Sequence, residues 1–66
     1  MSKAEVLAVK EFNADGEVID EWTTREFPAD RHHEVLGELI HVLDGRLASY
    51  EIALQDKVVA SNRPAV

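Results

Sequence analysis

The chain has 66 residues with 13 Asp or Glu against 7 Lys or Arg, so its formal net charge is −6. A chain this short makes one domain and buries only about 60% of its unfolded surface. It holds no cysteine, which excludes a disulfide framework and a thiolate metal site. No apolar run is long enough for a signal peptide or a membrane-spanning helix. We therefore predict a single α+β domain over 1–66 with a cytoplasmic location.

The first third of the chain predicts a β-hairpin. Residues 4–12 and 17–27 are rich in Val, Ile, Thr and aromatic side chains, and 13–16 (NADG) between them is typical of a turn. A type I turn closed by a left-handed Gly16 pairs Asn13 with Glu17. Counting outward sets Lys10 opposite Asp20, and likewise Glu5 opposite Arg25.

This register divides the apolar side chains of the hairpin between two faces. One face receives Val6, Ala8, Phe12, Val18 and Trp22, and we expect it to face the helix because aromatic residues bury the largest area. The other face receives Leu7, Val9, Ile19 and Phe27. Since one helix covers only one face of a small sheet, this arrangement predicts a second copy or a partner on the other.

The segment 27–46 (FPADRHHEVLGELIHVLDGR) predicts an amphipathic helix. Pro28 and the acidic residues of the first turn favour its start, and a left-handed Gly45 followed by Arg46 is expected to end it. Gly37 indicates a close backbone contact. The apolar stripe has helical spacing and contains Val35, Leu36, Leu39, Ile40 and Leu43, with His32 at its edge.

The last third predicts a second hairpin, which gives the order ββαββ. Residues 47–54 alternate with Ala48, Tyr50, Ile52 and Leu54 on one side, and a two-residue turn at 55–56 leads into 57–60, with Val59 opposite Ile52. A second helix over this segment is the alternative, ββαα, because its residues also tolerate helical spacing. We expect a frayed tail over 62–66.

Nothing in the chain predicts an enzyme or a cofactor site. His33 and Glu34 begin like the zinc-protease motif HExxH, but Gly37 occupies the place of the second histidine. No pair of carboxylates is arranged for acid and base catalysis. A weak divalent-ion site on one helix face is the remaining possibility for metal, formed from His33, Glu34, Glu38 and His41.

In layout and acidity the chain resembles small phage-encoded inhibitors of host machinery, such as anti-CRISPR proteins and an inhibitor of bacterial RNA polymerase. The resemblance implies inhibition by protein binding and no role for any single residue. The hairpin with Asp15-Gly16 followed by a helix is also similar to the front of HicB-type antitoxins. Where those antitoxins carry Pro-Glu-Leu-Pro-Gly after the second strand, this chain reads Arg25-Glu26-Phe27-Pro28-Ala29.

The charge distribution predicts the function. Direct binding of nucleic acid requires a basic face and is rejected, whereas an acidic front half attracts a basic surface on a partner protein, including one that itself holds nucleic acid. We therefore predict a protein-binding module, homodimeric, that inhibits or regulates its partner. The alternative is a self-associating structural or assembly protein, or an antitoxin-like component. The residues expected to bind the partner are Glu11, Asp15, Glu17, Asp20 and Glu21, with Trp22 or Phe27 as an aromatic anchor.

Overall fold

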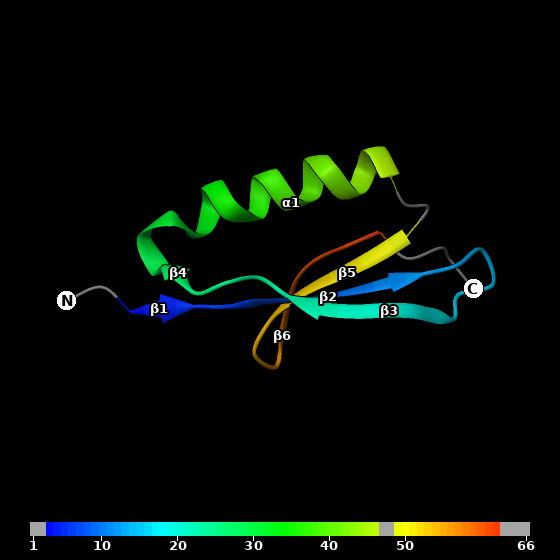
Figure 1. Ribbon diagram of the computed structural model, residues 1–66, viewed down its shortest axis with the longest axis horizontal. Helices are drawn as coiled ribbons and strands as arrows, with labels where there is room; N and C mark the ends of the chain where they lie inside the picture. Colours follow the sequence, from blue (N-terminus) through cyan, green and yellow to red (C-terminus); the bar gives the residue numbers. More distant parts are fainter. Residues whose placement is uncertain (1–2, 47–48, 63–66) are drawn as a thin grey trace.

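The computed structural model describes residues 3–46 and 49–62, which form a helix packed on one face of an antiparallel sheet (Figure 1). The four-stranded sheet has the order β3-β2-β5-β6, and a second, two-stranded sheet joins β1 to β4. In chain order the elements are β1 (Ala4–Glu5), β2 (Leu7–Phe12), β3 (Val18–Thr23), β4 (Phe27–Pro28), the 3₁₀ turn η1 (Ala29–Arg31), α1 (His32–Arg46), β5 (Ser49–Leu54) and β6 (Lys57–Ser61). The predicted ββαββ arrangement is confirmed, and the ββαα alternative is wrong.

The first hairpin has the predicted turn but not the predicted register. Gly16 is left-handed, with φ +84°, and the N–H of Asn13 donates to the carbonyl of Glu17 at 2.9 Å. Beyond the pair Phe12–Val18 the ladder shifts by one residue, because Ile19 is an extra residue in β3. This β-bulge sets Lys10 opposite Glu21 rather than Asp20.

The same hairpin shifts once more where β1 pairs with β4. Glu5 lies opposite Phe27, not Arg25. Between the two ladders the N–H of Leu7 donates to Oγ1 of Thr24 at 3.0 Å, and the N–H of Thr24 donates to the carbonyl of Leu7 at 2.9 Å. The Thr24 hydroxyl thus takes the place of one backbone acceptor of the ladder. The observed partner of Glu5 is therefore two residues further along the chain than the predicted one.

The second hairpin repeats this pattern. Its turn at 55–56 is the predicted one, with Leu54 opposite Lys57 and Gln55 left-handed at φ 54°. One pair later Val59 becomes an extra residue, so Ile52 lies opposite Ala60 and not Val59. Both edge strands of the four-stranded sheet therefore carry a bulge, a device that hinders pairing with another sheet edge.

The core lies between α1 and the sheet. Leu7, Val9, Leu43, Tyr50 and Ile52 are buried there, and each is at most 4% exposed. Trp22 packs against this cluster as predicted, but its ladder partner is Val9 instead of Ala8. The prediction that places Leu7 and Val9 away from the helix is wrong, because the Ile19 bulge turns Trp22 to their face.

The face of the sheet opposite α1 carries smaller and charged side chains. In register, Lys10 of β2 lies between Glu21 of β3 and Glu51 of β5, and its Nζ is 3.9 Å from a Glu21 carboxylate oxygen. Ala8 and Ala53 are paired next to them. By alternation along β2, Phe12 lies on this face together with Ala8, buried but outside the core cluster, so the prediction that these two side chains face the helix is wrong.

The apolar stripe of α1 is confirmed. Partly buried Val35, Leu36, Leu39 and Ile40 pack on the core around Leu43. At the start of the helix, His32 Nδ1 lies 2.8 Å from a carboxylate oxygen of Glu5 and ties α1 to β1.

Three details of the predicted helix are wrong. Phe27 and Pro28 form β4 instead of the first helical turn, and α1 begins only at His32, after the 3₁₀ turn. Gly45 is not left-handed, and the helix runs on to Arg46. Gly37 faces open space, with nothing within 4 Å of an added Cβ, so it makes no close contact.

Of the expected tail, Asn62 is held by Tyr50, whose carbonyl accepts its N–H at 3.1 Å. Residues 63–66, and the predicted positions Leu47 and Ala48, lie outside the described residues.

Candidate functional site

The turn between β2 and β3 is held by one asparagine. The side-chain oxygen of Asn13 accepts the N–H groups of Asp15 and Glu17 at 2.9 and 3.0 Å. Its backbone carbonyl accepts the N–H of Gly16 at 3.0 Å. Asn forms this kind of turn readily because its short side chain replaces a backbone acceptor. The acidic side chains that follow therefore project from a backbone that is already ordered.

The acids of this turn are exposed and not neutralised. Asp15, Glu17 and Asp20 are exposed, and none forms an ion pair with any residue in 3–46 or 49–62. Between them Val18 and Ile19 are 49% and 56% exposed, two adjacent aliphatic side chains among these acids. We call the set formed by Asp15, Glu17, Val18, Ile19, Asp20 and Glu21 the hairpin surface.

Glu21 belongs to the hairpin surface but is partly neutralised. Its carboxylate faces Lys10 at 3.9 Å, and both side chains are largely exposed. Exposed pairs of this kind are weak and exchange readily with other partners. Asp20 Oδ1 accepts the N–H of Glu21 at 2.9 Å, which fixes the direction of the Asp20 side chain.

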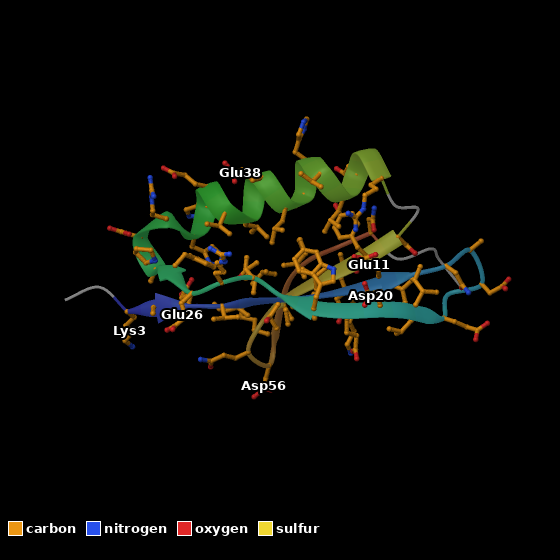
Figure 2. All side chains as sticks on the ribbon, viewed as in Figure 1. Lys3, Glu11, Asp20, Glu26, Glu38 and Asp56 are labelled. Carbon is orange, nitrogen blue, oxygen red and sulfur yellow. The ribbon has the colours of Figure 1, made fainter. Side chains whose placement is uncertain are left out.

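Glu11 differs from the acids of the hairpin surface in being buried. It is 5% exposed and lies on the helix side of the sheet, opposite Asp20 and Tyr50 in register (Figure 2). The indole N–H of Trp22 and Nη2 of Arg46 both donate to its Oε2, the latter at 3.0 Å. Glu11 is therefore a structural acid that joins the sheet to the end of α1, and it adds little to the field of the hairpin surface.

A second polar contact lies beside Glu11. The buried hydroxyl of Tyr50 donates to Oδ1 of Asp44 at 2.7 Å, while the N–H of Tyr50 donates to Oδ1 of Asn62 at 2.7 Å. The hydrogen bond to Asp44, together with burial and the negative charge of Asp44, raises the pKa of Tyr50 from 10.0 to about 12. We call Glu11, Trp22, Arg46, Asp44 and Tyr50 the helix-end network.

The sequence did not reveal the helix-end network, because its members come from four separate elements. The available signal was alternation: Glu11 shares a strand face with Leu7 and Val9, and a charge on an apolar face requires a partner. The predicted register hid that signal, since it assigned Leu7 and Val9 to an outward face. Arg46 was expected only to complement the end of the helix.

Neither expected aromatic anchor is exposed. Trp22 and Phe27 are partly buried and pack against the core cluster. Trp22 is further held by its hydrogen bond to Glu11. The exposed apolar contribution on the hairpin comes instead from Val18 and Ile19, which the sequence analysis did not single out as binding residues.

The remaining candidate chemistry concerns metal ions and membranes. Within 3–46 and 49–62, no three His, Asp or Glu side chains come together in a way that could hold a metal ion, the helix group His33, Glu34, Glu38 and His41 included. Glu34 lies 3.5 Å from Arg31. Across the same described residues, the structure contains no helix with the length and apolar character needed to cross a membrane.

Comparisons of the chain with protein families, with curated proteins and with solved structures find no match.

Proposed function

We propose that the chain is a small non-enzymatic protein-binding module whose hairpin surface engages a basic surface of a partner protein and so inhibits or regulates it. The observation that carries the proposal is the exposure of Asp15, Glu17 and Asp20, which form no ion pair with the described residues, next to exposed Val18 and Ile19 on an ordered turn. A cytoplasmic location belongs to the same proposal, as the cysteine-free composition is compatible with a reducing compartment.

Charge and shape favour a partner with positive charge around a small apolar contact. Opposite potentials steer association and set specificity, while exposed Val18 and Ile19 supply area that loses water on contact. Because Asn13 already orders the turn, little backbone freedom is lost on binding. Such a basic surface on the partner is also the kind that holds nucleic acid, so occupying it is a direct route to inhibition.

The sheet edges favour side-chain recognition over strand addition. In β3 the bulge at Ile19 interrupts the ladder next to the turn, and in β6 the bulge at Val59 does the same. Continuous edge pairing needs an uninterrupted row of backbone groups. The alternative of a structural protein that assembles by sheet edges therefore has less support than recognition by the hairpin surface.

The test is capture of partner proteins by three immobilised forms of the chain. The wild type is compared with Asp15→Lys/Glu17→Lys/Asp20→Lys and with Glu26→Lys/Glu38→Lys/Asp56→Lys. The second variant makes the same change in net charge on exposed acids away from the β2–β3 turn (Figure 2). Lysate of the organism that produces the chain is applied at low and high salt, and retained proteins are identified by mass spectrometry.

The proposal expects basic proteins that the wild type and the second variant retain at low salt and the hairpin variant loses. High salt should release them, because screening weakens exposed charge pairs. Equal loss with both variants would show that only the net charge matters. Equal retention by all three forms would contradict the proposal.

A further inference from the structure

A groove lies between β1 and the β5–β6 turn. It has a volume of about 470 Å³ and is lined by Lys3, Val6, Leu54, Gln55 and Lys57, among others. The groove exists because the β2–β5 ladder ends at Leu7 and Leu54. Beyond that pair the chain before Leu7 runs on to meet β4, whereas β5 turns back into β6. We call this feature the lysine groove.

The lysine groove carries free positive charge. Lys3 and Lys57 are exposed, and neither forms an ion pair with a residue that the structure describes. Glu5 also lines the groove, but its carboxylate lies 2.8 Å from His32 Nδ1. Half-buried Val6 and Leu54 add apolar surface to the lining of the groove. The groove thus offers two cations and an apolar contact.

The hairpin surface has the complementary composition. It presents Asp15, Glu17 and Asp20 around exposed Val18 and Ile19, so both charge and apolar character match the groove. One molecule cannot make this contact within itself. The molecule is 43 Å long, with the β2–β3 turn at one end and β1 near the other (Figure 1).

We propose that the lysine groove receives the β2–β3 turn of a second copy of this chain. Two copies that lie antiparallel make the contact twice, each turn in the other's groove, and this gives a closed two-fold dimer. The inference rests on the hairpin surface being the recognition surface of the proposed function. It adds that a basic partner then competes with the second copy for the same acids.

The first test is sedimentation velocity of the whole chain over about 10 µM to 1 mM protein, a range set by the modest strength of exposed ion pairs. Salt of about 0.15 M screens the repulsion between two net-negative molecules beyond about 8 Å and leaves contact pairs in place. The expected species has twice the monomer mass of 7.4 kDa. At about 1 M salt, where screening reaches contact distance, it should dissociate.

Lys3→Gln/Lys57→Gln should weaken the dimer at least about tenfold, because it removes both groove cations. Arg25→Gln/Arg31→Gln is the matched control: it removes two exposed cations that do not line the groove, changes the net charge equally, and should dimerise like the wild type. Circular dichroism spectra that superimpose on the wild type show that the variants are folded.

A charge exchange gives the sharper result. Asp15→Lys/Glu17→Lys alone and Lys3→Glu/Lys57→Glu alone should each be monomeric, and an equimolar mixture should form the dimer again. A monomeric wild type across the whole range, an unweakened groove variant, or a mixture that stays monomeric would each overturn the inference. A monomeric wild type that still captures a basic protein through its hairpin acids would leave the proposed function standing. A dimer that captures none would overturn the proposed function alone.

Discussion

The helix-end network and the hairpin surface put acids of the same β-hairpin to opposite uses. Glu11 and Asp15 are four positions apart in the chain. Yet Glu11 is 5% exposed and accepts two hydrogen bonds, whereas Asp15 is exposed and forms no ion pair with the described residues. Sequence proximity and charge do not separate the two. Their place in the hairpin does: Glu11 lies on β2, where the end of α1 covers it, whereas Asp15 lies in the turn beyond the strand.

The two groups of acids should contribute differently to stability. The acids of the helix-end network are held by donors from β3, α1 and β5, so their removal leaves buried groups unpaired. The acids of the hairpin surface are exposed, so we expect their removal to leave the stability of the fold nearly unchanged.

The largest effect is expected for Glu11→Ala. It leaves the indole N–H of Trp22 without its acceptor and Arg46 without its carboxylate, which should lower the free energy of unfolding by about 3 kcal/mol. Glu17→Ala, on the exposed turn, should change it by no more than about 0.5 kcal/mol. Urea unfolding followed by Trp22 fluorescence measures both. Equal losses for the two variants would contradict the division between the regions.

A smaller effect is expected for Tyr50→Phe. Losing the hydrogen bond to Asp44 should cost about 1 to 2 kcal/mol at neutral pH, because the part-buried contact between hydroxyl and carboxylate is lost while the ring remains. Urea unfolding again supplies the number. Asp44→Asn keeps an acceptor oxygen for the hydroxyl and is the milder control.

Tyr50 also gives the network a pH dependence with a definite sign. Its folded-state pKa is raised from 10.0 to about 12, so above pH 10 the unfolded chain loses a proton that the folded chain retains. The contribution of Tyr50 to stability is fully present below pH 10.0 and is lost as the pH rises to about 12. The difference in unfolding free energy between the wild type and Tyr50→Phe should therefore shrink over that range. A difference that stays constant would contradict the assignment.

The smallest effect on stability is expected for Asp15→Asn/Glu17→Gln/Asp20→Asn. Because these acids form no ion pair with residues 3–46 or 49–62, the fold should change in stability by about 0.5 kcal/mol or less, with relief of repulsion between the acids favouring a small gain. Thermal unfolding followed by circular dichroism is sufficient to measure it. A loss of about 2 kcal/mol would mean that these acids support the fold, in conflict with their exposure.

The sequence predicted the elements well because each has a local cause. The turn at 13–16 needs Gly16 to be left-handed, the stripe from Val35 to Leu43 needs a helix, and the turn at 55–56 ends two alternating segments. These features depend on neighbours in the chain. The pairs next to each turn, Phe12–Val18 and Leu54–Lys57, were predicted correctly for the same reason.

The strand registers were mispredicted, and the error begins at a bulge shortly after each turn. The bulges at Ile19 and Val59 add one residue to an edge strand, and a one-residue shift moves the side chains beyond it to the other face. The residue types at these two positions, Ile and Val, are ordinary for a strand and do not indicate a bulge. Trp22 was therefore paired with Ala8, and Glu11 was assigned to the outside. Asp15 and Glu17 are exposed as expected, because they lie in or directly after the turn and precede the first bulge.

The account's central claim is that the acids of the hairpin surface serve recognition and not stability. Its most direct test is the amount of basic protein retained from lysate by Asp15→Asn/Glu17→Gln/Asp20→Asn relative to the wild type. Unfolding measured beforehand should show that the two proteins have the same unfolding free energy. We predict a fall of at least about tenfold, equivalent to 1.4 kcal/mol of binding free energy, with no loss of stability. Retention equal to that of the wild type would contradict the claim.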